Sequence, residues 1–228
     1  MVAPVTVAHN CIVLGRSILC FFACSLYLAV ALPLAAQSVT AVSNSSMEFS
    51  DPAFGVSFRF PSGWSFSRVD PGAQSPALAI AWTENRTVST GLRGLITNET
   101  LHGLHAWPRT VFSSVEFAYD ARPAVSADAC RQLAQQDWQQ ETDPIALDSV
   151  TFWHGTASND GLSTEVAEDI YAAFLPAPGA CLRFDLAVAT SHVPGRDYPR
   201  ELTGREQQLI HQSLSNILDS VQITSPVR

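Results

Sequence analysis

An alternating segment at residues 54–64, FGVSFRFPSGW, constrains the fold of this chain more than any other stretch. Val56, Phe58 and Phe60 alternate with Ser57 and Arg59, and this period of two is typical of a β-strand with one buried face. The proline that follows has no N–H to donate, so the strand ends there or lies at the edge of its sheet. The segment therefore predicts a domain built on a β-sheet with one apolar face.

The sequence patterns in most of the remaining chain also predict strands joined by turns. The expected strands span residues 77–82, 111–119, 149–154, 165–175 and 181–190. Polar turns are expected at residues 156–161 and 176–179, and an irregular connection at 83–101. The alternation is most regular at 181–190, where Leu182 and Phe184 face one way and Arg183 and Asp185 face the other. These patterns predict a meander of antiparallel strands.

Two helices are expected beside the sheet. The first spans residues 127–141, with Ser126 as its N-cap and the Asp143-Pro144 step as its end. The second spans residues 204–218, where Thr203 and Glu206 form a capping box and an apolar stripe follows at helical spacing. A short strand at residues 221–223 then closes the domain, and the stripe predicts that Leu214 and Ile217 are buried.

The two ends of this pattern together resemble PsbP-like domains. Such domains open with G-apolar-x-apolar-x-apolar-P-x-x-W, as residues 55–64 do, and close with a helix and strand reading I-L-x-S-apolar, as residues 217–221 do. The middle of the chain has no counterpart in the resemblance. The resemblance implies an α+β fold, an antiparallel sheet flanked by two main helices, over residues 51–225. It also implies a non-catalytic binding or assembly role without a cofactor.

The amino terminus predicts export. His9 and Arg16 precede a 20-residue apolar run at residues 17–36. The sequence LPLAAQS at 32–38 carries the small residues that a signal peptidase accepts where this run ends. Residues 1–36 are therefore expected to be a signal peptide cleaved after Ala36, with a secreted or periplasmic mature chain. The alternatives are an uncleaved membrane anchor and a lipoprotein lipidated on Cys24. Residues 37–50 are expected to form a flexible leader.

Charge restricts the classes of partner. The formal net charge is −8, all 13 basic residues are arginine, and loss of Arg16 with the signal peptide moves the charge to about −9. An acidic chain without a basic cluster disfavours nucleic acid and anionic lipid surfaces. Membrane contact is expected only if residues 17–36 remain uncleaved. The predicted partner is an unknown protein or a small ligand.

The usual catalytic motifs are missing from the sequence. It has no G-x-S-x-G, no phosphate-binding glycine loop, no H-E-x-x-H and no C-x-x-C, and the lack of lysine excludes Schiff-base chemistry. The chain is therefore predicted not to be an enzyme. The alternative is a secreted metal-dependent hydrolase using Glu99, His102 and His105, because the two histidines share one face if the segment is helical. Gly103 and Pro108 disfavour such a helix, so two loop histidines are the simpler interpretation.

Cysteine count predicts one disulfide. Only Cys130 and Cys181 remain once residues 1–36 are removed, and exported proteins meet an oxidising environment in which such a pair is usually bridged. Strict alternation places Cys181 on the face of Arg183 and Asp185, so the bridge requires the first helix to cover that face. The alternative is a pair of separate buried thiols.

Two further residue types leave their roles open in the sequence. Tryptophans can line a ligand pocket or fill the core, and they occur at positions 64, 82, 107, 138 and 153. The sequons at Asn44, Asn85 and Asn98 matter only if the chain enters a glycosylating pathway.

Overall fold

The computed structural model describes residues 37–43, 45–68, 92–98, 110–160, 164–191 and 200–224. The strands in this part of the chain are β1 Ser38–Ser43, β2 Ser46–Asp51, β3 Val56–Pro61, β4 Ser65–Arg68, β5 Leu92–Asn98, β6 Phe112–Pro123, β7 Gln140–Leu147, β8 Val150–Asp160, β9 Thr164–Leu175, β10 Ala180–Ser191 and β11 Gln222–Ile223. The helices are α1 Ala127–Gln135 and α2 Gly204–Asp219.

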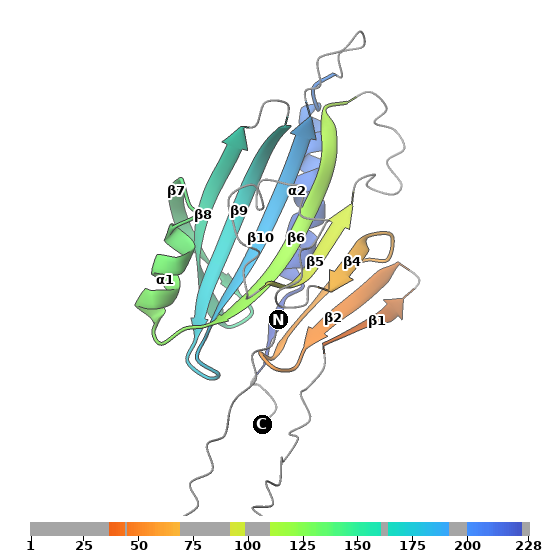
Figure 1. Cartoon of the computed structure of the whole chain (residues 1–228). Helices are drawn as coiled ribbons and strands as arrows, with labels where there is room; N and C mark the ends of the chain where they lie inside the picture. Colours follow the sequence, from red (N-terminus) through yellow and green to blue (C-terminus); the bar gives the residue numbers. More distant parts are fainter. Residues whose placement is uncertain are drawn as a thin grey trace, which may run out of the picture. The chain divides into compact units, whose positions relative to one another are not determined.

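The described strands form two antiparallel sheets. The smaller has the order β1-β2-β3-β11, and the larger has the order β4-β5-β6-β10-β9-β8-β7 (Figure 1). The larger sheet consists mostly of four long strands of 11 or 12 residues, which are β6, β8, β9 and β10. β8, β9 and β10 follow one another in the chain and pair as antiparallel neighbours, whereas β6 pairs with β10 although α1, β7, β8 and β9 lie between them in the sequence.

One face of the larger sheet meets the smaller sheet and α2. Phe58 of β3 lies at the centre of this layer, with its ring centroid 5.1 Å from that of Phe117 on β6 and 6.3 Å from that of Phe184 on β10. Leu214 and Ile217 of α2 are buried in the same core, as predicted. Figure 1 shows α2 behind β10 and β6, the strands that it contacts. The core is therefore closed by a second sheet and one helix together.

The opposite face of the larger sheet carries α1 and buried charges. α1 contacts β9 and β10, and its predicted N-cap is confirmed, because the Ser126 hydroxyl accepts a hydrogen bond from the Ala129 N–H (3.1 Å). Arg183 and Asp185 of β10 are buried on this face. A hydrophobic helix alone could not cover this charged surface, so it is satisfied by ion pairs described below.

The predicted α+β class is wrong. The described part of the chain is mostly β, with two antiparallel sheets and only two short helices. The smaller sheet was not predicted, and it packs together with α2 on one face of the larger sheet. The second helix itself is confirmed with its capping box, and strands β6, β9 and β10 match expected strands.

The expected flexible leader at residues 37–50 is also wrong. Residues 38–43 and 46–51 form β1 and β2, and Phe49 is fully buried. The Gln37 side-chain amide donates a hydrogen bond to buried Asp51 (3.1 Å). The folded domain therefore begins well before residue 51.

The first helix ends earlier than expected, at Gln135 instead of residue 141. The indole of Trp138 packs on Gly155 of β8, where a Cβ atom would overlap the ring. The next residue, Gln139, donates its N–H to the Thr156 carbonyl (2.9 Å), so the chain has already joined the sheet. Pro144 lies in the irregular register of edge strand β7, and β8 continues through most of the expected turn at 156–161.

Several expectations lie outside the described residues. They are the signal peptide at 1–36, the strand at 77–82 and most of the irregular connection at 83–101, of which residues 92–98 form β5. No helix within the described ranges is long and apolar enough to cross a membrane.

Candidate functional site

A pocket of about 280 Å³ lies between the first half of α2 and one end of the larger sheet. Its lining combines apolar side chains with polar ones: Val111, Ala167, Val188, Leu202 and Ile210 are apolar, and Glu165, Thr190, Glu201, Gln207 and His211 are polar. Ligand pockets in proteins are mostly apolar with a few polar groups, and they measure about 300–1,000 Å³. At about 280 Å³, with as many polar as apolar lining residues, this pocket is slightly smaller and more polar than that.

Adjacent strands β9 and β10 supply the floor of the pocket. Ala167 lies opposite Val188, and Glu165 lies opposite Thr190, in the antiparallel register. All four share the sheet face of the core, because Leu186 precedes Val188 by two residues and is buried there. Ala167 and Glu165 are nevertheless exposed, so the core face of β9 is left open at this end.

The start of α2 fixes the other wall. The Glu206 carboxylate accepts hydrogen bonds from the Thr203 N–H (2.8 Å) and from both Nη atoms of Arg200 (2.6 and 2.7 Å). These contacts lower the pKa of Glu206 to about 2, with the Arg200 hydrogen bonds as the largest cause. The charged capping box sets where the helix begins. The capping box thereby places Gln207, which lies one helical turn after the N-cap Thr203, in the pocket lining.

Backbone hydrogen bonds join the segment before α2, which forms another wall of the pocket, to the larger sheet. The Val111 N–H donates to the Arg200 carbonyl (3.0 Å), and the Ser191 N–H donates to the Val111 carbonyl (2.6 Å). Thr110 and Arg200 also form an isolated parallel bridge. The pocket therefore lies where the segment leading into α2 is tied to the ends of β6 and β10.

A second polar cluster crosses strands β7, β8 and β9. His154 Nε2 lies 2.9 Å from Asp169 Oδ1, and His154 Nδ1 lies 2.5 Å from Thr142 Oγ1. Because a carboxylate only accepts, Nε2 carries a proton and donates it to Asp169, while Nδ1 and the Thr142 hydroxyl share the other hydrogen bond. The imidazole stacks on the Tyr171 ring at 4.2 Å. Both ring nitrogens thus bond within the sheet, and the cluster links edge strand β7 through β8 to β9.

The pKa of the Tyr171 hydroxyl is raised by its surroundings. Burial raises the pKa of its hydroxyl to about 12, and the carboxylates of Asp169 and Asp219 add to the shift. The phenol therefore stays protonated throughout the ordinary pH range, and it offers a hydrogen bond instead of a base.

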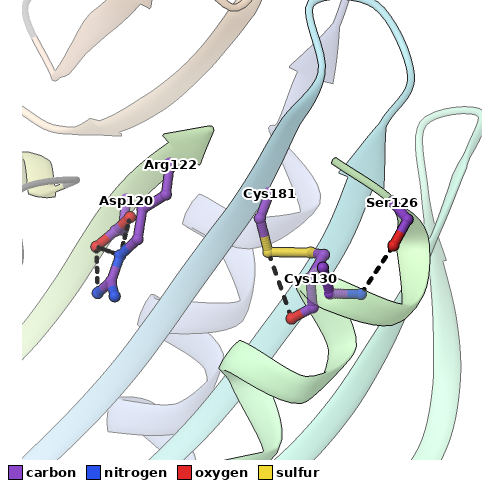
Figure 2. Close-up of a disulfide and its surroundings, with 6 residues drawn as sticks. Asp120, Arg122, Ser126, Cys130 and Cys181 are labelled. Carbon is purple, nitrogen blue, oxygen red and sulfur yellow. Dashed lines mark hydrogen bonds and ion pairs between the residues drawn. A yellow bond between two sulfur atoms is a disulfide. The ribbon is translucent and has the colours of Figure 1, made fainter. Parts of the chain in front are cut away.

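The disulfide between Cys130 and Cys181 is present and joins α1 to β10 (Figure 2). The Cα atoms are 5.1 Å apart, within the range of ordinary disulfides. The predicted pair is confirmed, and so is its structural requirement, because α1 covers the face that carries Arg183. Close by, Arg183 pairs with Asp185 (2.6 Å) and with Asp137, which follows α1.

The metal site predicted from Glu99, His102 and His105 lies outside the described residues, so it stays a prediction. Within the described ranges, no three His, Cys, Asp or Glu residues form a group that could hold a metal ion.

The structure describes three of the five tryptophans and one of the three sequon asparagines. Trp64 is buried in the core, and Trp138 and Trp153 are half-buried; none of these three lines the pocket. The other two tryptophans, at positions 82 and 107, lie outside the described residues, as do Asn44 and Asn85. Asn98 is the last residue of β5.

Sequence reasoning did not find the pocket. Its lining comes from four stretches of the chain: the residue before β6, β9, β10, and α2 with the segment that leads into it. The only local signal is on α2, where Gln207 and His211 are polar neighbours at i, i+4 beside the buried Ile210.

No family model and no curated protein matches this sequence. The PsbP-like resemblance is therefore not confirmed. Solved structures similar to the chain include LpqN, a Mycobacterium tuberculosis protein involved in cell envelope biogenesis. It is 9% identical with a TM-score of 0.40, and the match covers 83% of this chain and 91% of LpqN. A Bacteroides thetaiotaomicron protein is 10% identical with a TM-score of 0.39, and 78% of this chain spans 48% of its length. Likeness at this level assigns no fold family and no function.

Proposed function

We propose that this chain is an exported, non-catalytic binding module that holds a small ligand in the pocket beneath α2. The observation that carries the proposal is the pocket itself, which lies beside the core and combines apolar with polar side chains. The volume of about 280 Å³ equals roughly nine water molecules at about 30 Å³ each, so the ligand is small. The site of action is the periplasm or the extracellular space.

Rigid elements support binding at this site. The floor lies on two paired strands, and α2 is fixed by a charged capping box at its start. Burial of Ile210 and Leu214 anchors the helix on the core. A pocket formed in advance loses little conformational entropy when a ligand enters, which favours affinity.

The proposal is tested by filling the pocket. Ala167 is exposed on the floor, so Ala167→Trp puts an indole into the cavity without disturbing the buried core. Butan-1-ol serves as a neutral probe small enough to enter, and the methyl NMR signals of Val188 and Ile210 report its arrival. The matched control is Ala146→Trp, at an exposed position of edge strand β7 outside the pocket.

The parent chain and Ala146→Trp are expected to show saturable shifts of both methyl signals. Ala167→Trp is expected to show none while keeping the melting temperature of the control. Unshifted signals in the parent chain, or shifts that persist in Ala167→Trp, would overturn the proposal.

A further inference from the structure

Strand β8 extends past the point where its outer neighbour β7 begins. Gln140, the first residue of β7, lies opposite Thr156, whereas β8 continues to Asp160. A continued register would place Trp138 opposite Ser158, but the ladder ends before that pair. Within the described residues, the outer side of β8 therefore has no neighbouring strand beyond Thr156.

The side chain of Gln139 occupies the place of the missing strand. Its carbonyl oxygen accepts hydrogen bonds from the Ser158 N–H and hydroxyl, both at 3.1 Å, and its amide nitrogen donates to the Ser158 carbonyl. In an antiparallel ladder, the two residues of a hydrogen-bonded pair exchange the same two backbone bonds. A glutamine carboxamide carries both a donor and an acceptor, as a backbone amide does. Gln139 therefore makes with β8 the contacts that a further strand would make.

This end of β8 lacks the features that usually protect an edge strand. Charged side chains, proline and irregular register are the common means by which edges avoid pairing with another chain. Strand β7 has all three, because Glu141, Asp143 and Pro144 lie around its register shift. Residues 156–159 of β8, TASN, have neither charge nor proline.

We propose that Gln139 is an edge cap, a side chain that prevents a second copy of this chain from adding its own β8 edge at Ser158. Two copies of one strand can pair antiparallel about a two-fold axis, because each then presents the same segment to the other. The edge cap competes with this pairing from within the same chain. The inference is independent of the proposed function, since neither Gln139 nor Ser158 belongs to the described lining of the α2 pocket.

Removal of the carboxamide tests the edge cap on the full chain as its host produces it. In Gln139→Ala, the Ser158 N–H loses its acceptor, so at a dilution that keeps the protein monomeric it is expected to exchange with heavy water roughly tenfold faster by NMR. At higher concentration the variant is expected to form a dimer in sedimentation velocity. The matched control is Gln140→Ala, an exposed glutamine one residue along, which should equal the parent chain in both measurements.

Two further variants locate the association on the β8 edge. The N–H of Asp160 points to the same side of β8 as that of Ser158, because backbone groups alternate in direction along a strand. Asp160→Pro in the Gln139→Ala background removes this N–H and is expected to abolish the dimer. Gln139→Glu keeps an acceptor for Ser158 and adds a charge at the edge, so it should associate no more than the parent chain.

The edge cap is overturned if Ser158 exchanges equally fast in Gln139→Ala and the parent chain, or if the variant associates no more strongly than the parent. Association that survives Asp160→Pro would also overturn it, because the contact would then lie on another surface. Equal association of Gln139→Glu would do the same, since general loss of stability would explain it. Neither readout involves the α2 pocket, so failure here does not bear on the proposed function.

Discussion

Arg183 shows how single residues allow a charged sheet face to be buried. Burial by itself lowers the pKa of its guanidinium, but the charges and hydrogen bonds of Asp185 and Asp137 outweigh burial and raise the pKa above its ordinary value. The group is therefore a permanent cation in a site that is 7% exposed. It links β10 to the residues just after α1, beside the disulfide that links the same elements.

Arg183→Met is expected to destabilise the protein by about 3–5 kcal/mol, because it leaves Asp185 and Asp137 buried without this cation. Urea unfolding measures the change. The control is Arg59→Met, which removes an exposed arginine paired with Glu48 and should cost no more than about 1 kcal/mol. A loss in Arg183→Met no larger than that of the control would show that the buried pairs do not hold α1 and β10 together.

Helix α2 begins with a capping box formed by Thr203 and Glu206, and the stability that this box contributes depends on pH. The folded state lowers the pKa of Glu206 from 4.5 to about 2, so the charged carboxylate stabilises the fold. The sign follows from linkage: this stabilisation is complete above pH 4.5 and is lost as pH falls toward about 2.

Glu206→Gln therefore should lower the free energy of unfolding most at neutral pH. The difference between the parent chain and the variant is expected to shrink below pH 4.5 and to vanish near pH 2, since protonated Glu206 and glutamine carry the same charge. Urea unfolding at a series of pH values measures it, with Gln208→Ala on the same helix as a control whose curve runs parallel to that of the parent. A pH-independent difference for Glu206→Gln would rule out the charged cap.

The elements that the sequence predicted well are those with one buried face. Alternation at residues 181–190 predicted β10, and the capping box with its apolar stripe predicted α2 almost residue for residue. The leader was misread because β1 is exposed at nearly every position, so no period of two marks it. The end of α1 was misread because the contact between Trp138 and Gly155 is tertiary, and local propensity does not encode it.

At the scale of the whole molecule, the sequence predicted an antiparallel sheet with helices but missed the second sheet. That sheet depends on pairing between β2 and β3 and between β3 and β11, and the last pair joins Val56 to Ile223 across most of the chain. The pocket was missed for the same reason, since four separate segments assemble it. The disulfide was predictable because only two cysteines remain after the expected cleavage.

Small-ligand binding in the pocket beneath α2 is the property on which the proposed function depends. Native mass spectrometry of protein purified gently from its own host tests this property most directly. The parent chain and Ala146→Trp are expected to show a small-molecule mass in addition to the protein, and Ala167→Trp is expected to show the protein mass alone. The bare protein mass in all three, or the same added mass in all three, would contradict the account.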